Sequence, residues 1–257
     1  HTIVPSGTVS GRASHRNPNL SAVPKVGLEF GKECRELFTV PDGWCLLGSD
    51  LSGLELRALS HYLNDGGEYA KQILEGDVHT YNAKAFGVDR PTAKTLVYAL
   101  IYGSGDQNLG KIAGGGAKLG KKLKADFNKN IPAFGMLLAK LKKAHERGYL
   151  VGLDGRKLYV RSEHKLLSQL LQSAGAIICK QWVALCDQKI NEQYGSDQAY
   201  IVGWIHDEIQ IACKNEDIAN GVGSITSRMA REAGETLKVK IPIGSEYSVG
   251  RTWASTH

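Results

Sequence analysis

The 257-residue sequence lacks the patterns that mark three protein classes. No run of about 18 consecutive apolar residues occurs, which argues against a membrane-spanning helix. The opening HTIVPSGTVSGR has neither the basic nor the apolar region of a secretory signal. The five cysteines form no CxxC pair and no even disulfide set, so we expect neither a structural zinc site nor a disulfide framework. These absences predict a soluble intracellular protein.

A large excess of charge of one sign is also missing. The 32 Lys and Arg residues exceed the 26 Asp and Glu residues by enough for a net charge of +6, which permits a polyanionic partner without requiring one. Hydrophobic residues make up 42% of the chain, and this length allows one large domain or two small ones. No internal repeat is visible.

The order of sequence patterns predicts an α+β fold. Residues 1–30 are rich in Gly, Pro, Ser and Asn, which favours an irregular, extended opening. Residues 67–147 are mainly helical in pattern, whereas GWCLLGSD, YIVGWI and EIQIAC are typical of buried strands. Asp-Gly in GYLVGLDGRKLYVR indicates a hairpin. We therefore expect a sheet-bearing domain with a helical insertion.

Two aspartates stand at predicted strand ends. Asp50 follows the strand GWCLLGS, and Asp207 lies between YIVGWI and EIQIAC. Carboxylates from separate strand ends can meet at one sheet edge, where oxygen ligands suit a two-metal phosphoryl-transfer site. However, Asp50 can equally be a helix N-cap, and the tip of a hairpin can simply be solvated. The spacing alone leaves both alternatives open.

The segment DRPTAKTLVYALIYGSG predicts a helix with a polar stripe. Pro91 can open the helix and Gly-Ser-Gly can close it. The stripe has one residue in every four: Arg90, Lys94, Tyr98 and Tyr102. Two cations near a helix start suit a polyphosphate, and aromatic rings can stack on a base or a sugar. A solvated amphipathic face remains the alternative from spacing alone.

The segment GGGAKLGKK nearly matches a phosphate-binding loop. It places Gly115, Gly120 and Lys121 as that motif requires, but Lys122 replaces the hydroxyl residue and no strand precedes the segment. We expect a basic, flexible turn between helices.

An ordered set of motifs covers nearly the whole chain. They are SGRASHRNPNL, DLSGLELRALSHYL, GDVHT, RPTAKTLVYALIYGSG, GLDGRKLYVRS, LLQSAGAIICK, WIHDEIQ and TWASTH. In this order they resemble the polymerase domain of family A DNA polymerases, and specifically the podovirus-type bacteriophage branch. The resemblance implies a right-hand polymerase palm with an antiparallel sheet, a mostly helical fingers subdomain, and a location in the host cytoplasm if the source is viral.

The resemblance also implies the chemistry. Asp50 and Asp207 match the carboxylates that bind two Mg²⁺ ions, with the backbone carbonyl of Leu51 as a further ligand. One ion would activate the primer 3′-hydroxyl, and the other would hold the incoming triphosphate. The implied reaction is template-directed transfer of deoxynucleotides onto a primer.

Further residues are expected to bind the nucleotide. Arg90 and Lys94 match phosphate ligands, and Lys94 also matches the proton donor to pyrophosphate. The other matches are a phosphate contact, a sugar and base contact, a stacking residue near the templating base and a steric gate against ribose: His79, Tyr98, Tyr102 and Glu55.

DNA contacts are implied as well. Arg12 matches an arginine that reads the minor groove at the primer end, where acceptors are nearly the same for every correct base pair. Gln172 and His206 match residues that line primer and template, and Glu208 completes the HDE motif. Ser168 departs from the family pattern, in which relatives commonly carry Asn, and this departure weakens the case for a hydrogen bond to DNA from this position.

The expected domains are a first palm part (residues 1–60), fingers (61–164) and a second palm part (165–257). The thumb and the 3′–5′ exonuclease of phage relatives are not in this sequence, so we expect a split polymerase or a fragment. Primer–template DNA, deoxynucleotides and a second polypeptide or a missing N-terminal region are the implied partners. The alternatives are a non-catalytic DNA-binding subunit and a single-subunit RNA polymerase, and Glu55 and Tyr98 argue against the latter.

Overall fold

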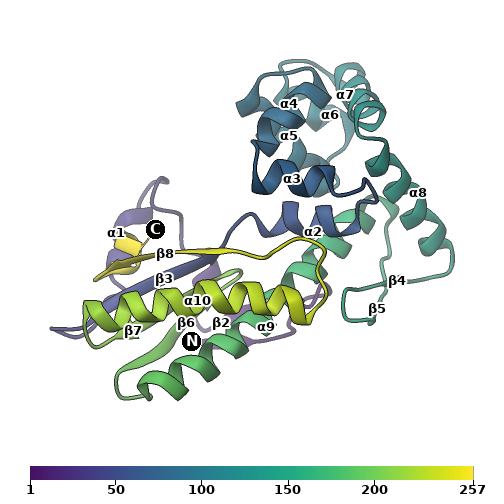
Figure 1. Ribbon diagram of the computed structural model, residues 1–257. Coiled ribbons are helices and arrows are strands. Elements are labelled where there is room, and N and C mark those ends of the chain that lie inside the picture. Colours follow the sequence, from purple (N-terminus) through teal and green to yellow (C-terminus); the bar gives the residue numbers. More distant parts are fainter. Residues whose placement is uncertain (257) are drawn as a thin grey trace. The chain divides into compact units, whose positions relative to one another are not determined.

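The computed structural model describes residues 1–256, which form two compact units (Figure 1). The first unit comprises His1–Leu54 and Gly175–His257, and the second comprises Glu55–Ala174. Two helices have residues in both units: α2 (Leu54–Tyr62) and α9 (Leu166–Tyr194). Within residues 1–256, no helix is long and apolar enough to cross a membrane.

The first unit contains a four-stranded antiparallel sheet of order β6-β7-β3-β8. Its strands are β3 (Cys45–Leu51), β6 (Ala199–Ile205), β7 (Glu208–Cys213) and β8 (Ser245–Gly250). The apolar, β-branched runs that predicted β3, β6 and β7 are therefore strands. All of β7 is buried, because it lies inside the sheet and both of its faces are covered.

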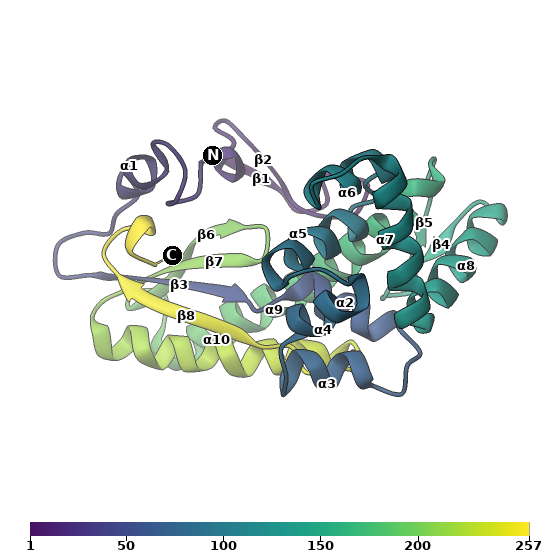
Figure 2. The ribbon, with the colours of Figure 1, turned by 90° about the horizontal axis from the view of Figure 1, so that it is seen from above.

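One face of this sheet packs against two helices. Ser49 of β3 donates to Thr226 Oγ1 of α10 (Glu216–Thr236) over 3.0 Å. The backbone oxygen of Thr226 accepts a bond of 2.9 Å from Nε1 of Trp182 on α9. Thr226 therefore joins strand and both helices, and α10 lies along the strands in both views (Figures 1 and 2).

The opposite face carries Leu46, Gly48 and Asp50. A side chain at Gly48 would collide with Gln210 and Thr256, so glycine permits the close approach of the C-terminal segment. That segment, η3 (Trp253–Thr256), packs beside α1 (Gly31–Glu36), as Figures 1 and 2 show.

The first 30 residues are largely irregular, as the sequence predicts. They contain only short elements within the described chain: β1 (Thr2–Val4), β2 (Ser14–Arg16) and η1 (Leu20–Ala22). The strands β1 and β2 pair in antiparallel fashion.

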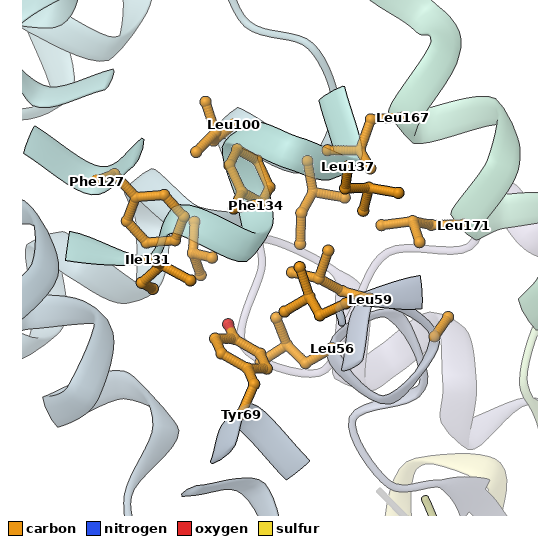
Figure 3. Close-up of a cluster of buried hydrophobic side chains, with 14 of the residues drawn as sticks. Leu56, Leu59, Tyr69, Leu100, Phe127, Ile131, Phe134, Leu137, Leu167 and Leu171 are labelled. Atoms are coloured by element: carbon orange, nitrogen blue, oxygen red, sulfur yellow. The ribbon is translucent and has the colours of Figure 1, made fainter. Parts of the chain in front are cut away.

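The second unit is mostly helical, as the helical pattern of residues 67–147 predicts. Its remaining helices are α3 (Glu68–Leu74), α4 (Val78–Phe86), α5 (Arg90–Ile101), α6 (Asp106–Ile112), α7 (Ala117–Asn130), α8 (Pro132–Glu146) and η2 (Glu163–Lys165). The predicted hairpin is formed by β4 (Leu150–Val151) and β5 (Lys157–Leu158). Side chains from several helices point into one apolar core, in which Phe127 stacks on Phe86 at 4.3 Å and meets Phe134 edge-on at 5.1 Å (Figure 3).

The glycine-rich segment GGGAKLGKK differs from our expectation of a flexible turn. Only its first part is a turn, because α7 begins at Ala117 and includes Gly120. A side chain at Gly120 would collide with the backbone of Asp106 and Gly110 on α6. Gly120 is therefore a packing residue that lets two helix backbones approach each other.

Candidate active site

Asp50 lies exposed near the end of β3, at the centre of a row of carboxylates. Glu208 of β7 and Glu246 of β8 are its direct partners across the sheet. Directly opposed residues of antiparallel strands project from the same face. Three carboxylates therefore occupy neighbouring positions there, and they line one depression of the surface.

Asp207 occupies the tip of the β6–β7 hairpin. Ile205 pairs with Glu208, so His206 and Asp207 form a two-residue loop. His206 has a φ of 58°, in the left-handed region that glycine favours at the first position of some hairpin loops. The backbone N–H of Leu51 donates to the carbonyl of Asp207 over 3.0 Å. This bond brings together the two motifs that the sequence predicts to form a metal site.

The thiol of Cys179 on α9 responds to both aspartates. Burial, together with the smaller effect of the negative charges of Asp207 and Asp50, raises the pKa of Cys179 to about 12, against a hydrogen bond from Trp204 that lowers it. Sequence reasoning missed Cys179 and Trp204, which no local pattern distinguishes from ordinary core residues.

Arg12 and His206 line one pocket together with Asp207. His206 is exposed, and its ring lies 6.4 Å from that of the buried His15 in an edge-on arrangement. Burial, with a smaller effect of His206, lowers the pKa of His15. The structure thus joins Arg12 and the HDE motif within the first unit.

Glu208 is only 7% exposed. Its Oε1 accepts hydrogen bonds from Trp253 Nε1 over 2.7 Å and from Gln210 Nε2 over 2.6 Å. The DNA contact expected for Glu208 stays a prediction, and the observed partners of this carboxylate are protein groups.

The oxygen donors of β3 and the hairpin can supply only part of the ligand shell of a Mg²⁺ ion. Within residues 1–256, no group of three or more His, Cys, Asp or Glu residues is arranged as a metal site. Mg²⁺ is commonly bound through one or two carboxylates, with water and substrate phosphates completing the shell. Asp50, Asp207 and the carbonyl of Leu51 fit that mode of binding, because the Leu51 to Asp207 hydrogen bond holds their backbones together.

A second group of predicted residues surrounds the start of α5. Arg90 Nε forms an ion pair of 2.6 Å with Asp77, and Asp77 caps α4 by accepting from the backbone of His79 and Thr80. Burial, followed by the charges of Lys94 and Arg90, lowers the pKa of His79, whereas Asp77 opposes the shift. His79, Arg90 and Lys94 therefore form one basic cluster in the second unit. Sequence reasoning passed over Asp77, although an acidic residue before a helix is an N-cap signal.

The predicted aromatic residues lie further along α5. Leu96, Val97, Leu100 and Ile101 are buried, which confirms that the apolar face of α5 lies away from the stripe. The ring of Tyr98 lies 6.4 Å from His79. Tyr102 follows the helix as its C-cap, and its hydroxyl donates to Glu55 Oε1 over 2.8 Å. Gln172 lies half-buried on the part of α9 that belongs to the second unit.

Comparison with known proteins identifies the family. The family model described as DNA polymerase family A matches residues 1–255. The chain belongs to DNA polymerase family A. This result confirms the resemblance found in the motifs.

Two phage proteins are similar to this family A chain over its whole length. The DNA-directed DNA polymerase of Enterobacteria phage T3 is 39% identical over 287 residues, and that of Escherichia phage T7 is 38% identical over 287 residues. Each alignment covers 100% of this chain and 41% of the relative. The chain therefore spans about two fifths of the length of these curated relatives, and the phage-type prediction is confirmed.

A solved structure shares the fold. It is described as the POL domain of Pol1 from M. smegmatis in complex with DNA primer-template and dNTP, and it has a TM-score of 0.86 at 22% identity. The match covers 99% of this chain and 48% of that chain. The predicted α+β fold, a polymerase palm with helical fingers, is confirmed.

Proposed function

We propose that this chain is the palm and fingers part of a template-directed DNA polymerase, which adds deoxynucleotides to a primer 3′-hydroxyl. The hydrogen bond from Leu51 to Asp207 carries the proposal, because it unites the two aspartate motifs of the family in one place. The whole-length similarity to two phage DNA polymerases supports it.

We assign residues 1–60 and 165–257 to the palm and residues 61–164 to the fingers. The two compact units change over after Leu54 and after Ala174, close to both proposed boundaries, which supports this assignment. The palm so defined contains the whole sheet, and the fingers contain α3 to α8.

In the palm, Asp50, Asp207 and the carbonyl of Leu51 would hold two Mg²⁺ ions. Bound there, these ions would lower the pKa of the primer 3′-hydroxyl and neutralise the leaving pyrophosphate. The protein's part is to hold the two carboxylates rigidly. The antiparallel pairing of β3 with β7 and the short hairpin loop supply that rigidity.

In the fingers, the basic cluster would bind the triphosphate of the incoming nucleotide. Arg90 and Lys94 would bind the phosphates, His79 would add a phosphate contact, and Lys94 would donate a proton to pyrophosphate. Burial, followed by the charges of these two cations, lowers the pKa of His79, and the positive charge gathered around its ring supports a binding site for a compensating anion.

Three further residues would select the nucleotide. Tyr98 would pack on its sugar and base, and Tyr102 would stack near the templating position. Glu55 would exclude a ribose 2′-hydroxyl, and its hydrogen bond with Tyr102 supports a fixed orientation for that carboxylate.

Primer–template DNA is the proposed partner, with Arg12, Gln172, His206 and Glu208 on its path. The pocket shared by Arg12, His206 and Asp207 supports a primer end at the hairpin. A second polypeptide, or a preceding part of the same chain, would supply the thumb and exonuclease. The lengths of the phage relatives support this view.

The test removes one carboxylate charge. Asp207→Asn is expected to abolish primer extension, measured with a thumb-bearing partner supplied, and to leave binding of primer–template DNA nearly unchanged. Asp197→Asn makes the same change at an exposed position of the first unit and should extend primers normally. Unchanged extension by Asp207→Asn would rule out the proposed mechanism.

A further inference from the structure

Two tryptophan N–H groups hold the residues on either side of Asp207. Trp204 Nε1 donates to the carbonyl of His206 over 2.9 Å, and Trp253 Nε1 donates to the carboxylate of Glu208 over 2.7 Å. The two indoles come from different parts of the chain, β6 and the C-terminal η3. Asp207 therefore stands between two tethered neighbours.

The tether at His206 stabilises an unfavourable backbone conformation. A φ of 58° at a residue other than glycine costs about 1 kcal/mol or more and persists only when the surroundings enforce it. The carbonyl of His206 accepts a second bond of 3.0 Å from the Cys179 thiol, and Trp204 Nε1 also lies 3.3 Å from that sulfur. Two groups, the Trp204 indole and the Cys179 thiol, thus fix the peptide that leads into Asp207.

The tether at Glu208 belongs to a buried network. Gln210 donates to Glu208, and Thr256 Oγ1 donates to Gln210 Oε1 over 3.0 Å. The indole of Trp253 is 3% exposed, and the guanidinium of Arg35 lies 4.3 Å from its ring centroid. A buried charged group needs such partners, because an unpaired one is strongly destabilising. The Trp253 indole is therefore held by Glu208 at its N–H group and by Arg35 over its ring.

We propose that Trp204 and Trp253 are positioning residues that set the orientation of the Asp207 carboxylate for the metal ions. The inference deepens the proposed function and rests on it. It assigns a role in the site to the C-terminal η3, and it makes Glu208 an anchor of the hairpin. Groups that orient a metal ligand typically change metal affinity about 10- to 100-fold when they are removed.

The experiment removes only the N–H donors. Trp204→Phe and Trp253→Phe keep an aromatic ring, and each is expected to weaken Mn²⁺ binding to the full chain about tenfold. Water-proton relaxation measures this binding without DNA or nucleotide, and Asp207→Asn defines the part of it that depends on that carboxylate. Hydrogen exchange at the Leu51 amide, which bonds to the Asp207 carbonyl, should become faster in Trp204→Phe.

Trp182→Phe is the matched control. It also removes a buried indole hydrogen bond, but the acceptor is the backbone carbonyl of Thr226 on α10 and neither His206 nor Glu208. We expect it to lower stability while Mn²⁺ affinity and Leu51 exchange stay at their wild-type values. If a Trp204 or Trp253 variant fails to fold, Cys179→Ala or Gln210→Leu removes another donor to the same acceptor.

The outcomes separate this inference from the proposed function. Variants with wild-type Mn²⁺ affinity, or an equal loss in Trp182→Phe, would overturn the role of the two indoles even if the wild-type chain extends primers. A selective loss of Mn²⁺ affinity supports that role even if the wild-type chain, supplied with a thumb-bearing partner, fails to extend a primer. Only the latter failure counts against the polymerase proposal.

Discussion

At the scale of single residues, the pKa of His79 depends on the charges around its ring. Its pKa lies below the ordinary value of 6.5 because the ring is partly buried and because Lys94 and Arg90 repel a further positive charge. The unfolded chain therefore binds a proton in a pH range where the folded chain does not. This contribution to stability is present above pH 6.5 and is lost as the pH falls from 6.5 through the folded-state pKa.

The pKa of His79 should rise when a deoxynucleoside triphosphate binds, because the phosphates offset the two neighbouring cations. NMR titration of the imidazole protons measures this shift. Lys94→Gln should also raise the pKa in the nucleotide-free chain, whereas Lys84→Gln, on the same helix as His79, should not. If neither the nucleotide nor Lys94→Gln changes the pKa of His79, the result would contradict the proposed phosphate site.

At the scale of elements, two helices of the second unit meet through glycine. Gly110 of α6 and Gly120 of α7 each lie against backbone atoms, with no room for a Cβ. Gly135 also lies inside a helix, α8, but its missing Cβ would meet only side-chain atoms of Asn128 at 3.9 Å, an ordinary contact.

Substitutions of Gly120 and Gly135 by alanine should change the free energy of unfolding in opposite directions. Gly120→Ala should lower the free energy of unfolding by about 1–3 kcal/mol, because the added methyl forces α6 and α7 apart. Gly135→Ala should raise it by about 0.4–1 kcal/mol, since alanine loses less conformational freedom on folding and nothing resists it. Urea denaturation of the full chain measures both, and equal effects would argue against backbone contact between the helices.

Much of this architecture could be predicted from local patterns. Apolar runs indicated β3, β6 and β7, and caps and spacing indicated α5, because these signals act between residues near in sequence. The tethers of the hairpin could not be predicted. Trp253 meets Glu208 across 45 positions, and Cys179 meets His206 across 27, so their bonds exist only after the chain has folded.

At the scale of the whole molecule, the sequence carries a net charge of +6 and spans 41% of its phage relatives. We expect the proposed binding to DNA to depend mainly on phosphate contacts, because positive charge is in excess on this chain. Such binding releases counterions and is therefore weakened by salt.

The logarithm of the association constant for a primer–template duplex should thus fall linearly with the logarithm of the salt concentration. Each neutralised phosphate adds about −0.9 to the slope. Fluorescence anisotropy with a labelled duplex measures it, and Lys189→Gln, which removes a cation already paired with Glu192, should leave the slope unchanged. Binding that does not respond to salt would indicate contacts of another kind.

The buried thiol of Cys179 contacts the Asp207 hairpin, so its reactivity can be used to measure opening of the hairpin. Only thiolates react quickly with alkylating reagents, and burial keeps the Cys179, Cys186 and Cys213 thiols protonated by raising the pKa of each. Cys34 and Cys45 are less buried, so they take up reagent first. Once those two are blocked, the slow rate of alkylation at Cys179 should report how often the contact between α9 and the Asp207 hairpin opens.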